Sequence, residues 1–216
     1  MIYKQRNIIL KSTIPSDLFF KLKERINKKS KSFTKELAGN IVREEDLEDF
    51  IPVVEPYLLH QIKMYEPFAQ EVIPEYLKSR HRKKGHKVGL NLKILWTNYM
   101  KKHEFNPIHA HDGCFSFILF MEIPFRSEEM RKIAPGVKSN FNQAGGLTFY
   151  HKGSSMPFNF FEEEVLFPDE TWEGQCLIFP AYLFHSVYPF YGTDGTRITI
   201  SGNVFVEVIN PPLLDE

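Results

Sequence analysis

The pattern of apolar and polar positions changes character after residue 87. Before that point, apolar residues recur every three or four positions, which is the period of an amphipathic helix. One such stretch covers residues 18–26, and a longer one begins near Pro52. Pro67 and Pro74 fall inside the longer stretch and are expected to kink or split it, since proline lacks the backbone N–H that an α-helix uses. We therefore expect residues 1–87 to form a helical segment that supports the rest of the domain.

From residue 88 onward, the chain consists of short runs rich in β-branched and aromatic residues, separated by Gly, Pro and charged residues. No gap between consecutive runs has room for a regular crossover helix, which parallel strands require. An antiparallel barrel or sandwich is therefore favoured over a parallel sheet. With no internal repeat in the sequence, we expect a single domain over residues 1–216, mainly β with N-terminal helices (α+β), whose β core covers residues 88–208.

The composition narrows the classes of partner. Hydrophobic residues make up 43% of the 216-residue chain, and 27 Lys and Arg residues balance 27 Asp and Glu residues. This neutral total gives no indication of a nucleic-acid or membrane partner. The basic run at residues 78–87 is the main charge cluster, and its interpretation as a phosphate-contacting patch competes with that of a solvated helix end. The first residues do not resemble a signal peptide, no run is long enough to span a membrane, and both cysteines lie in apolar runs, so we expect a cytoplasmic protein.

Two histidines stand one residue apart in the segment NPIHAHDGCFSFILF, residues 106–120. Alternate side chains of a strand share a face, so His109 and His111 are expected to point the same way while Asp112 points the other way. Two imidazoles on one face can chelate one metal ion, but a pair is weak evidence in a chain with 8 histidines. A third ligand must come from elsewhere in the sequence.

The best candidate for that third ligand is His185, which follows an apolar strand and a proline-marked corner in CLIFPAYLFHSVYPF. Further along, a strand places Arg197, Thr199 and Ser201 on one face. An arginine that faces inward needs an anionic partner, because a buried guanidinium without one is very costly. A bound carboxylate would provide that partner through bidentate hydrogen bonds, and a carboxylate of the protein could do the same.

The order of these motifs is similar to that of a known enzyme family. An H-x-H/D motif, about seventy residues, an FPxxxxH motif and then an arginine in an R-x-T/S pattern resemble the Fe(II)- and 2-oxoglutarate-dependent oxygenases. The resemblance is closest to prolyl hydroxylase-like 2-oxoglutarate oxygenases of tailed phages and marine bacteria. It covers residues 92–204, and LAGNI at residues 37–41 also resembles that group. It implies a double-stranded β-helix, which is a cupin-like jelly roll, and a dioxygenase that hydroxylates a protein or peptide side chain or a small molecule.

The resemblance also implies which residues hold the metal. His109 would be the first iron ligand, His111 would occupy the place of the usual aspartate, and His185 would be the distal ligand. Asp112 is the alternative to His111 if a bulge before Gly113 turns it inward, whereas regular strand alternation favours His111.

For the cosubstrate, the resemblance assigns Arg197 to the far carboxylate of 2-oxoglutarate, with Thr199 or Ser201 as hydroxyl partner. Asn98 and Tyr99, at the end of the preceding strand, are expected as further cosubstrate contacts. The expected cofactors are Fe(II) and 2-oxoglutarate, and the other partners are O2 and an unidentified substrate. Oxidation of that substrate would be coupled to decarboxylation of 2-oxoglutarate to succinate, in the host cytoplasm if the protein is encoded by a phage.

Two other functions fit the same residues. A cupin-type dioxygenase uses three histidines and no keto acid, but it leaves Arg197 without a reason to face inward. A non-catalytic jelly-roll binding protein, for example a structural component of a phage, would keep the fold without binding iron. Nothing in the sequence indicates an oligomeric state.

Overall fold

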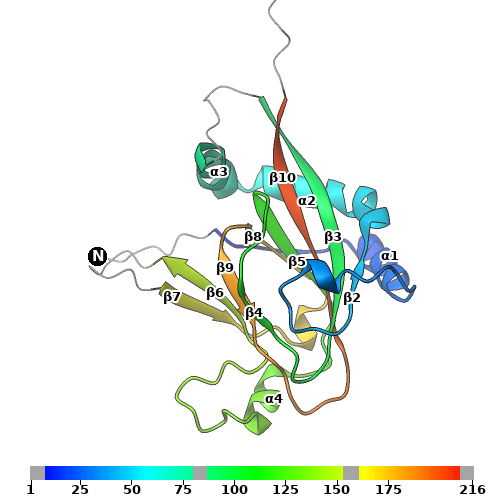
Figure 1. The fold of residues 1–216 in the computed structure, drawn as a ribbon, viewed down its shortest axis with the longest axis vertical. Coiled ribbons are helices and arrows are strands. Elements are labelled where there is room, and N and C mark those ends of the chain that lie inside the picture. The colour runs from blue at the N-terminus through cyan, green and yellow to red at the C-terminus, as the bar shows by residue number, and fades with distance from the viewer. Residues whose placement is uncertain (1–7, 80–86, 153–160, 210–216) are drawn as a thin grey trace, which may run out of the picture.

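In a computed structural model of the protein, which describes residues 8–79, 87–152 and 161–209, ten strands form two antiparallel sheets (Figure 1). The larger sheet has the strand order β1-β8-β5-β10-β3-β2, and the smaller sheet has the order β4-β9-β6-β7. In that order, the strands of the larger sheet are Leu10–Thr13, Gln175–Pro180, Phe115–Glu122, Arg197–Ile209, Lys87–Met100 and Glu44–Asp46. Those of the smaller sheet are Asn106–His109, Phe184–Val187, Leu147–Lys152 and Phe161–Leu166. The mainly β, antiparallel architecture is therefore as expected.

Strand β5 shows how the larger sheet is covered on both sides. Its sequence FSFILFME is apolar at most positions and buried at every position but the last. Phe117 and Leu119 belong to the core beneath the helices, whereas Ile118 and Phe120 belong to the core shared with the smaller sheet. A strand that is buried on both faces has a nearly continuous apolar sequence, because neither set of alternate side chains meets water.

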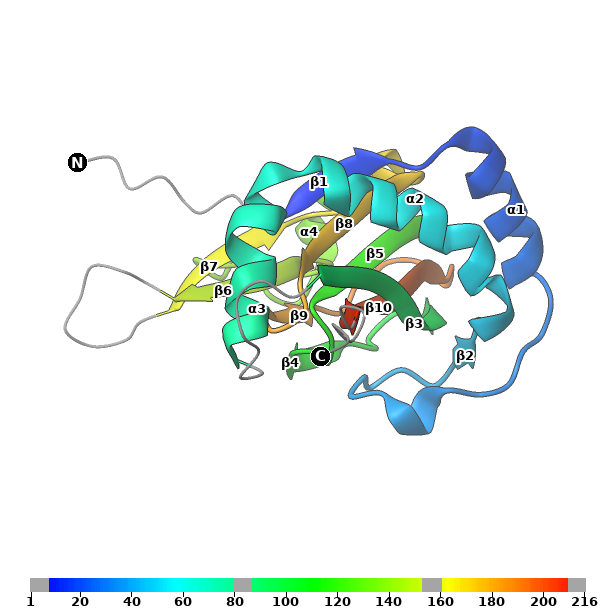
Figure 2. The ribbon, with the colours of Figure 1, turned by 90° about the horizontal axis from the view of Figure 1, so that it is seen from above.

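The helices of the N-terminal segment lie on the outer face of the larger sheet (Figure 2). Helix α1 (Ser16–Ile26) buries three residues at helical spacing against this face. The longer apolar stretch is split as expected: α2 (Ile51–Met64) ends before Pro67, a π-helical turn follows at Phe68–Val72, and α3 (Ile73–Ser79) completes the stretch. The break near Pro67 agrees with the loss of a backbone donor at that position.

The N-terminal segment is not purely helical, which differs from the expectation. Strand β1 pairs with β8 and strand β2 pairs with β3, so both edges of the larger sheet come from this segment. These strands are 4 and 3 residues long, too short for an alternating pattern to stand out in the sequence. A further short helix, α4 (Ser127–Ile133), lies between β5 and β6 in the chain.

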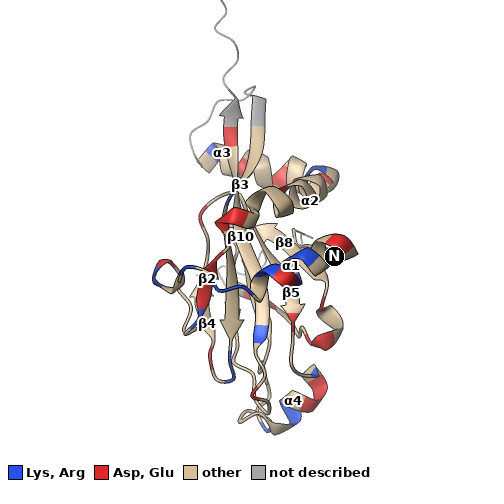
Figure 3. Cartoon of the chain, turned by 90° about the vertical axis from the view of Figure 1, so that its right-hand side faces the viewer, with Lys and Arg blue, Asp and Glu red and all other residues tan. Residues whose placement is uncertain are grey.

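Charged side chains do not gather by sign on the outer helices. Both α1 and α4 carry acidic and basic residues side by side (Figure 3), in keeping with the neutral total charge. Of the basic run, residues 80–86 lie outside the described residues, and Lys78 is in an exposed ion pair with Glu75 at 3.3 Å. Among the described helices, none is long and apolar enough to span a bilayer.

Candidate functional site

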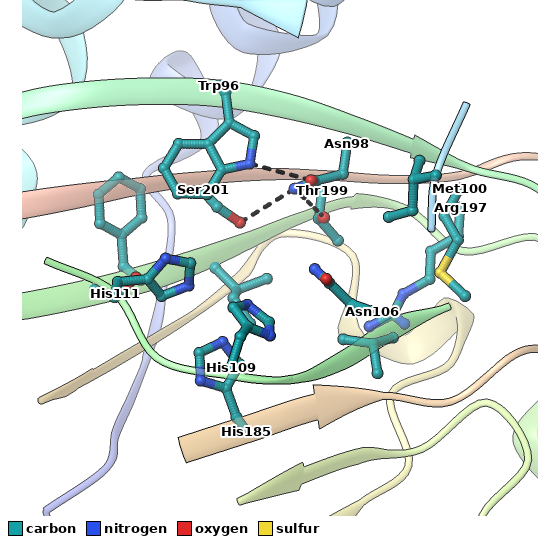
Figure 4. Close-up of a pocket in the computed structure, with 15 residues that line it drawn as sticks. Trp96, Asn98, Met100, Asn106, His109, His111, His185, Arg197, Thr199 and Ser201 are labelled. Carbon is teal, nitrogen blue, oxygen red and sulfur yellow. Dashed lines mark hydrogen bonds between the residues drawn. The ribbon is translucent and has the colours of Figure 1, made fainter. Parts of the chain in front are cut away.

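Three histidines meet between the two sheets, where β4 ends and β9 begins. His109 and His185 are direct partners in the pairing of these strands, and His111 lies two residues beyond His109. The ring centroids are 4.3 Å apart for His109 and His185, 4.8 Å for His109 and His111, and 5.0 Å for His111 and His185. Ring nitrogens of the three residues lie within 4.8 Å of one another, so the imidazoles could hold one metal ion (Figure 4).

Backbone carbonyls fix the tautomer of two of these rings. Nδ1 of His109 lies 2.7 Å from the carbonyl oxygen of Pro107, and Nδ1 of His185 lies 3.0 Å from that of Leu183. A carbonyl oxygen can only accept, so Nδ1 carries the proton in both rings and donates it. The lone pair is then on Nε2, as in metal-binding histidines whose other nitrogen is held by a second group.

The surroundings favour the neutral form of all three imidazoles. Burial lowers the pKa of His109, and burial together with the neighbouring His109 lowers the pKa of His111 to about 3. His185 is 3% exposed, and burial followed by the two other rings lowers its pKa well below the ordinary value. Neutral imidazole is the form that binds a metal ion, because its lone pair is free.

The structure brings His111 into this cluster and leaves Asp112 outside it. Asp112 is exposed, whereas His111 is half-buried and its ring lies 5.6 Å from that of Trp96. The backbone N–H of His111 donates to the carbonyl of Ala181 at 2.8 Å, which continues the strand-like course past the end of β4. The chain bends over residues 112–114, with a φ of 95° at Gly113, and the exposed Asp112 stays outside the cluster, as alternation predicts.

Strand β10 carries a polar face into the same pocket. Arg197, Thr199 and Ser201 line it and are 3%, 8% and 7% exposed. Nε of Arg197 has no hydrogen-bond partner, and within residues 8–79, 87–152 and 161–209 no carboxylate forms an ion pair with this side chain. Its guanidinium carbon lies 5.9 Å from the ring centroid of Phe120, and burial lowers its pKa to about 10. Beside the histidines there is therefore a buried cation without an anion.

The two expected cosubstrate contacts on β3 lie on opposite sides of the strand. Asn98 lines the pocket and donates from Nδ2 to the hydroxyls of Thr199 and Ser201, at 3.3 Å in each case. Tyr99 faces the core beneath the helices, and its hydroxyl donates to the carbonyl of Ile26 at 2.8 Å. Adjacent strand residues point to opposite faces, so the structure places Asn98 in the pocket and Tyr99 outside it.

A comparison with protein-family models adds to this geometry. Residues 94–203 match the model described as "Putative 2OG-Fe(II) oxygenase", and this range contains all three histidines and Arg197. The chain belongs to this 2OG-Fe(II) oxygenase family. The expected cofactors, Fe(II) and 2-oxoglutarate, are those that define the family. A comparison with curated protein sequences gave no significant match.

Solved structures agree with the fold of this 2OG-Fe(II) oxygenase. The crystal structure of a Pseudomonas putida prolyl-4-hydroxylase is 12% identical, covers 90% of each chain and has a TM-score of 0.51. HygX from Streptomyces hygroscopicus, with nickel and 2-oxoglutarate bound, is 10% identical, covers 92% of this chain and 82% of its own, and has a TM-score of 0.50. At this level of identity the likeness concerns the fold alone, and it confirms the double-stranded β-helix.

Three polar residues that line the oxygenase's pocket, Trp96, Asn106 and Ser116, were not among the site residues predicted from the sequence. Trp96 lies two residues before Asn98 on β3, so strand alternation would have placed both on one face. Asn106 is an odd number of residues from His109, and alternation would have turned it away from the site. A shift of register between these two residues brings both into the pocket.

The side chains of the pocket fit the family's cofactors. Imidazole nitrogen is a good ligand for iron, and three neutral imidazoles add no negative charge to the metal. Within the described parts of the chain no carboxylate pairs with the buried guanidinium of Arg197, and the carboxylates of 2-oxoglutarate are anions that a guanidinium binds through two parallel hydrogen bonds. The ligands for the iron and the cation for the carboxylate therefore line one pocket of the oxygenase.

Proposed function

We propose that the chain is an Fe(II)- and 2-oxoglutarate-dependent dioxygenase that hydroxylates a protein or peptide side chain or a small molecule. In this proposal it is most closely related to the prolyl hydroxylase-like oxygenases of tailed phages and marine bacteria. The family membership supports the cofactors, and the fold it shares with a prolyl-4-hydroxylase supports the type of reaction.

In the proposed site, His109, His111 and His185 bind the metal ion through their free ring nitrogens. Arg197 binds the far carboxylate of 2-oxoglutarate, with the hydroxyl of Thr199 or Ser201 as a second contact. The keto acid and O2 would reach the metal ion from the pocket that Arg197, Thr199 and Ser201 also line. Fe(II) bound there would supply the activation of O2, with one oxygen atom passing to the substrate and the other to succinate as 2-oxoglutarate loses CO2.

One observation carries the proposal: Arg197, whose Nε has no hydrogen-bond partner and which forms no ion pair with a carboxylate of the described residues, lines the same pocket as the three histidines. A buried charge without a partner costs folding free energy, so a protein retains one mainly where a ligand compensates it. An arginine in the core of a merely structural jelly roll would be expected to pair with a carboxylate of the protein itself.

The set of three histidines favours a second candidate, a cupin-type dioxygenase that uses no keto acid. The usual set in 2-oxoglutarate oxygenases has two histidines and one carboxylate. Asp112, the only carboxylate next to these histidines in the sequence, is exposed and lies outside the cluster. The two candidates differ in their need for Arg197, which only the first one uses.

Binding and turnover measurements separate these functions. In the proposed function the purified chain binds Mn(II), the Mn(II)-loaded protein binds 2-oxoglutarate, and the Fe(II)-loaded protein forms succinate with uptake of O2. Binding of Mn(II) without binding of 2-oxoglutarate would instead support the cupin-type dioxygenase. If the chain binds neither Mn(II) nor 2-oxoglutarate, the result would support a non-catalytic jelly roll. His185→Ala should then give the same Mn(II) titration as the wild type.

A further inference from the structure

A chain of side-chain hydrogen bonds runs along the wall of the pocket, from Trp96 to the hydroxyls of Thr199 and Ser201, two and four residues beyond Arg197 on β10 (Figure 4). Nε1 of Trp96 donates to Oδ1 of Asn98 at 3.1 Å. Nδ2 of Asn98 then donates to Oγ1 of Thr199 and to Oγ of Ser201, both at 3.3 Å. None of these four residues is more than 8% exposed, so water does not compete freely for their hydrogen bonds.

The chemistry of the donors fixes the direction of every bond in this chain. An indole N–H can only donate, so the amide oxygen of Asn98 must face Trp96, and its NH2 group must face Thr199 and Ser201. Each hydroxyl therefore accepts from Asn98. A hydroxyl has one proton to donate, and these two protons remain available for a ligand in the pocket. A carboxylate is such a ligand, since it only accepts.

Without the indole N–H, this direction would be lost. The amide of Asn98 could rotate by half a turn and present its oxygen to the hydroxyls, because the two ends of an amide have nearly the same shape. Thr199 and Ser201 would then donate to Asn98, and their lone pairs would face the ligand carboxylate. Trp96 thus determines whether the two hydroxyls attract an anion or repel it.

Packing holds the indole of Trp96 in place. One neighbour is Phe33, which stacks on it with ring centroids 6.1 Å apart and an interplanar angle of 30°. Another is His111, whose ring centroid lies 5.6 Å away. Phe33 belongs to the N-terminal segment, so this segment packs against the first residue of the hydrogen-bond chain.

We propose that Trp96 is a positioning residue that, through Asn98, sets the hydroxyls of Thr199 and Ser201 as donors to the carboxylate bound by Arg197. The inference rests on the proposed function, because it takes that carboxylate to be one end of 2-oxoglutarate. Trp96 itself does not touch the reacting atoms. It raises the affinity for an acid with a second carboxylate, and it leaves the affinity for the metal ion unchanged.

A double-mutant cycle with the Mn(II)-loaded full-length chain tests this role, with calorimetric titration of 2-oxoglutarate as the readout. Trp96→Phe keeps an aromatic ring and removes the N–H, and we expect the dissociation constant to rise about fivefold to tenfold. Asn98→Ala should raise it about as much, and the double variant no more than Asn98→Ala alone, because both changes break one chain. Mn(II) affinity should stay within about twofold. Trp172→Phe, which alters the other tryptophan of the chain, is the matched control and should bind 2-oxoglutarate as the wild type does.

The outcomes distinguish this inference from the proposed function. If the wild type binds 2-oxoglutarate but Trp96→Phe binds it equally well, or if the two effects multiply in the double variant, the positioning role is wrong and the function stands. If the wild type does not bind 2-oxoglutarate, both are wrong. Asn98→Asp provides a second route should Trp96→Phe not fold: its carboxylate accepts from the indole but cannot donate, so it should weaken 2-oxoglutarate binding more than Asn98→Ala does. An equal or smaller effect would contradict the proposed direction of the bonds.

Discussion

Replacing Arg197 by Met should separate the stability of the protein from its affinity for 2-oxoglutarate. Methionine fills a similar length of the pocket wall without a charge. Since no described carboxylate pairs with Arg197, the substitution leaves no acidic group of the described chain unpaired. We therefore expect the ligand-free Arg197→Met variant to be at least as stable as the wild type and to bind 2-oxoglutarate poorly.

The expected gain in the free energy of unfolding follows from the burial of the Arg197 charge. Burial lowers the pKa of Arg197 to about 10, which means that the folded state binds this proton less tightly than the unfolded state does. At about 1.4 kcal/mol per pH unit, the cost to folding is about 3 kcal/mol. The cost is fully present below pH 10 and disappears only as the pH rises past the folded-state pKa. Arg197→Met should therefore raise the free energy of unfolding at pH 7 by up to about 3 kcal/mol, less any loss of packing.

Loss of the guanidinium should also weaken the binding of 2-oxoglutarate. Two charge-assisted hydrogen bonds contribute about 1.5 kcal/mol or more each, which corresponds to at least about a hundredfold increase in the dissociation constant. Urea unfolding of the metal-free protein measures the stability, and calorimetric titration of the Mn(II)-loaded protein measures the affinity.

A matched control and a clear refutation are available. Arg25 contacts Asp49 through two hydrogen bonds of 2.7 and 2.9 Å; it lies on α1 and does not line the pocket. Arg25→Met should lower the free energy of unfolding and leave 2-oxoglutarate binding unchanged. If Arg197→Met instead lost about 2 kcal/mol or more of stability in the absence of ligand, Arg197 would have a partner within the protein, and the reasoning from an unpaired charge would be refuted.

Three further predictions concern other parts of the molecule. Burial and the nearby Glu104 raise the pKa of Glu44 from 4.5 to about 7, so the wild type loses stability as the pH rises through this interval. In urea unfolding, the free energy of unfolding of Glu44→Gln should exceed that of the wild type by up to about 3 kcal/mol at pH 8 and equal it at pH 4. The same difference at both pH values would contradict a buried carboxyl group that titrates in this range. His111→Ala should weaken Mn(II) binding at least about tenfold, whereas Asp112→Ala should leave the Mn(II) affinity within about twofold of the wild type. Electron paramagnetic resonance of Mn(II) measures both affinities, and the reverse order of effects would make Asp112 the ligand. Gly113→Ala should lower the free energy of unfolding by more than about 1 kcal/mol, since φ is 95° and a Cβ would lie 2.8 Å from the carbonyl oxygen of Val204. Gly174→Ala, with φ 79° and no atom within 4 Å of the added Cβ, should lower it less in thermal unfolding. Equal losses of stability would show that the contact with Val204 is not destabilising.

Much of the β core could be predicted because its strands have clear patterns. β5 is apolar at all positions but Ser116 and Glu122, and β10 alternates between Ile198, Ile200 and Val204 on one face and polar residues on the other. On a solvent-facing sheet, that polar face would meet water. Here it is buried, and the presence of Arg197 at its start was the feature of the sequence that indicated a binding site.

The edges of the larger sheet could not be predicted, because β1 and β2 are too short to show a period. Within the site, strand alternation correctly placed His109 and His111 together, but it could not show that a shift of register brings Asn106 to the same side. Naming both Asn98 and Tyr99 as pocket residues conflicted with alternation itself, since neighbours on a strand face opposite ways. Regular geometry was thus predictable, and local departures from it were not.

Anaerobic addition of 2-oxoglutarate to the Fe(II)-loaded protein tests the central claim most directly. A keto acid that chelates Fe(II) through its carboxylate and carbonyl oxygens produces a charge-transfer band in the visible spectrum, which neither component shows alone. We predict that the wild type develops this band, that His185→Ala does not, and that Arg197→Met develops it only at far higher 2-oxoglutarate concentrations. Tight binding of Fe(II) by the wild type without any band at saturating 2-oxoglutarate would contradict the claim that the three histidines and Arg197 form a single Fe(II) and 2-oxoglutarate site.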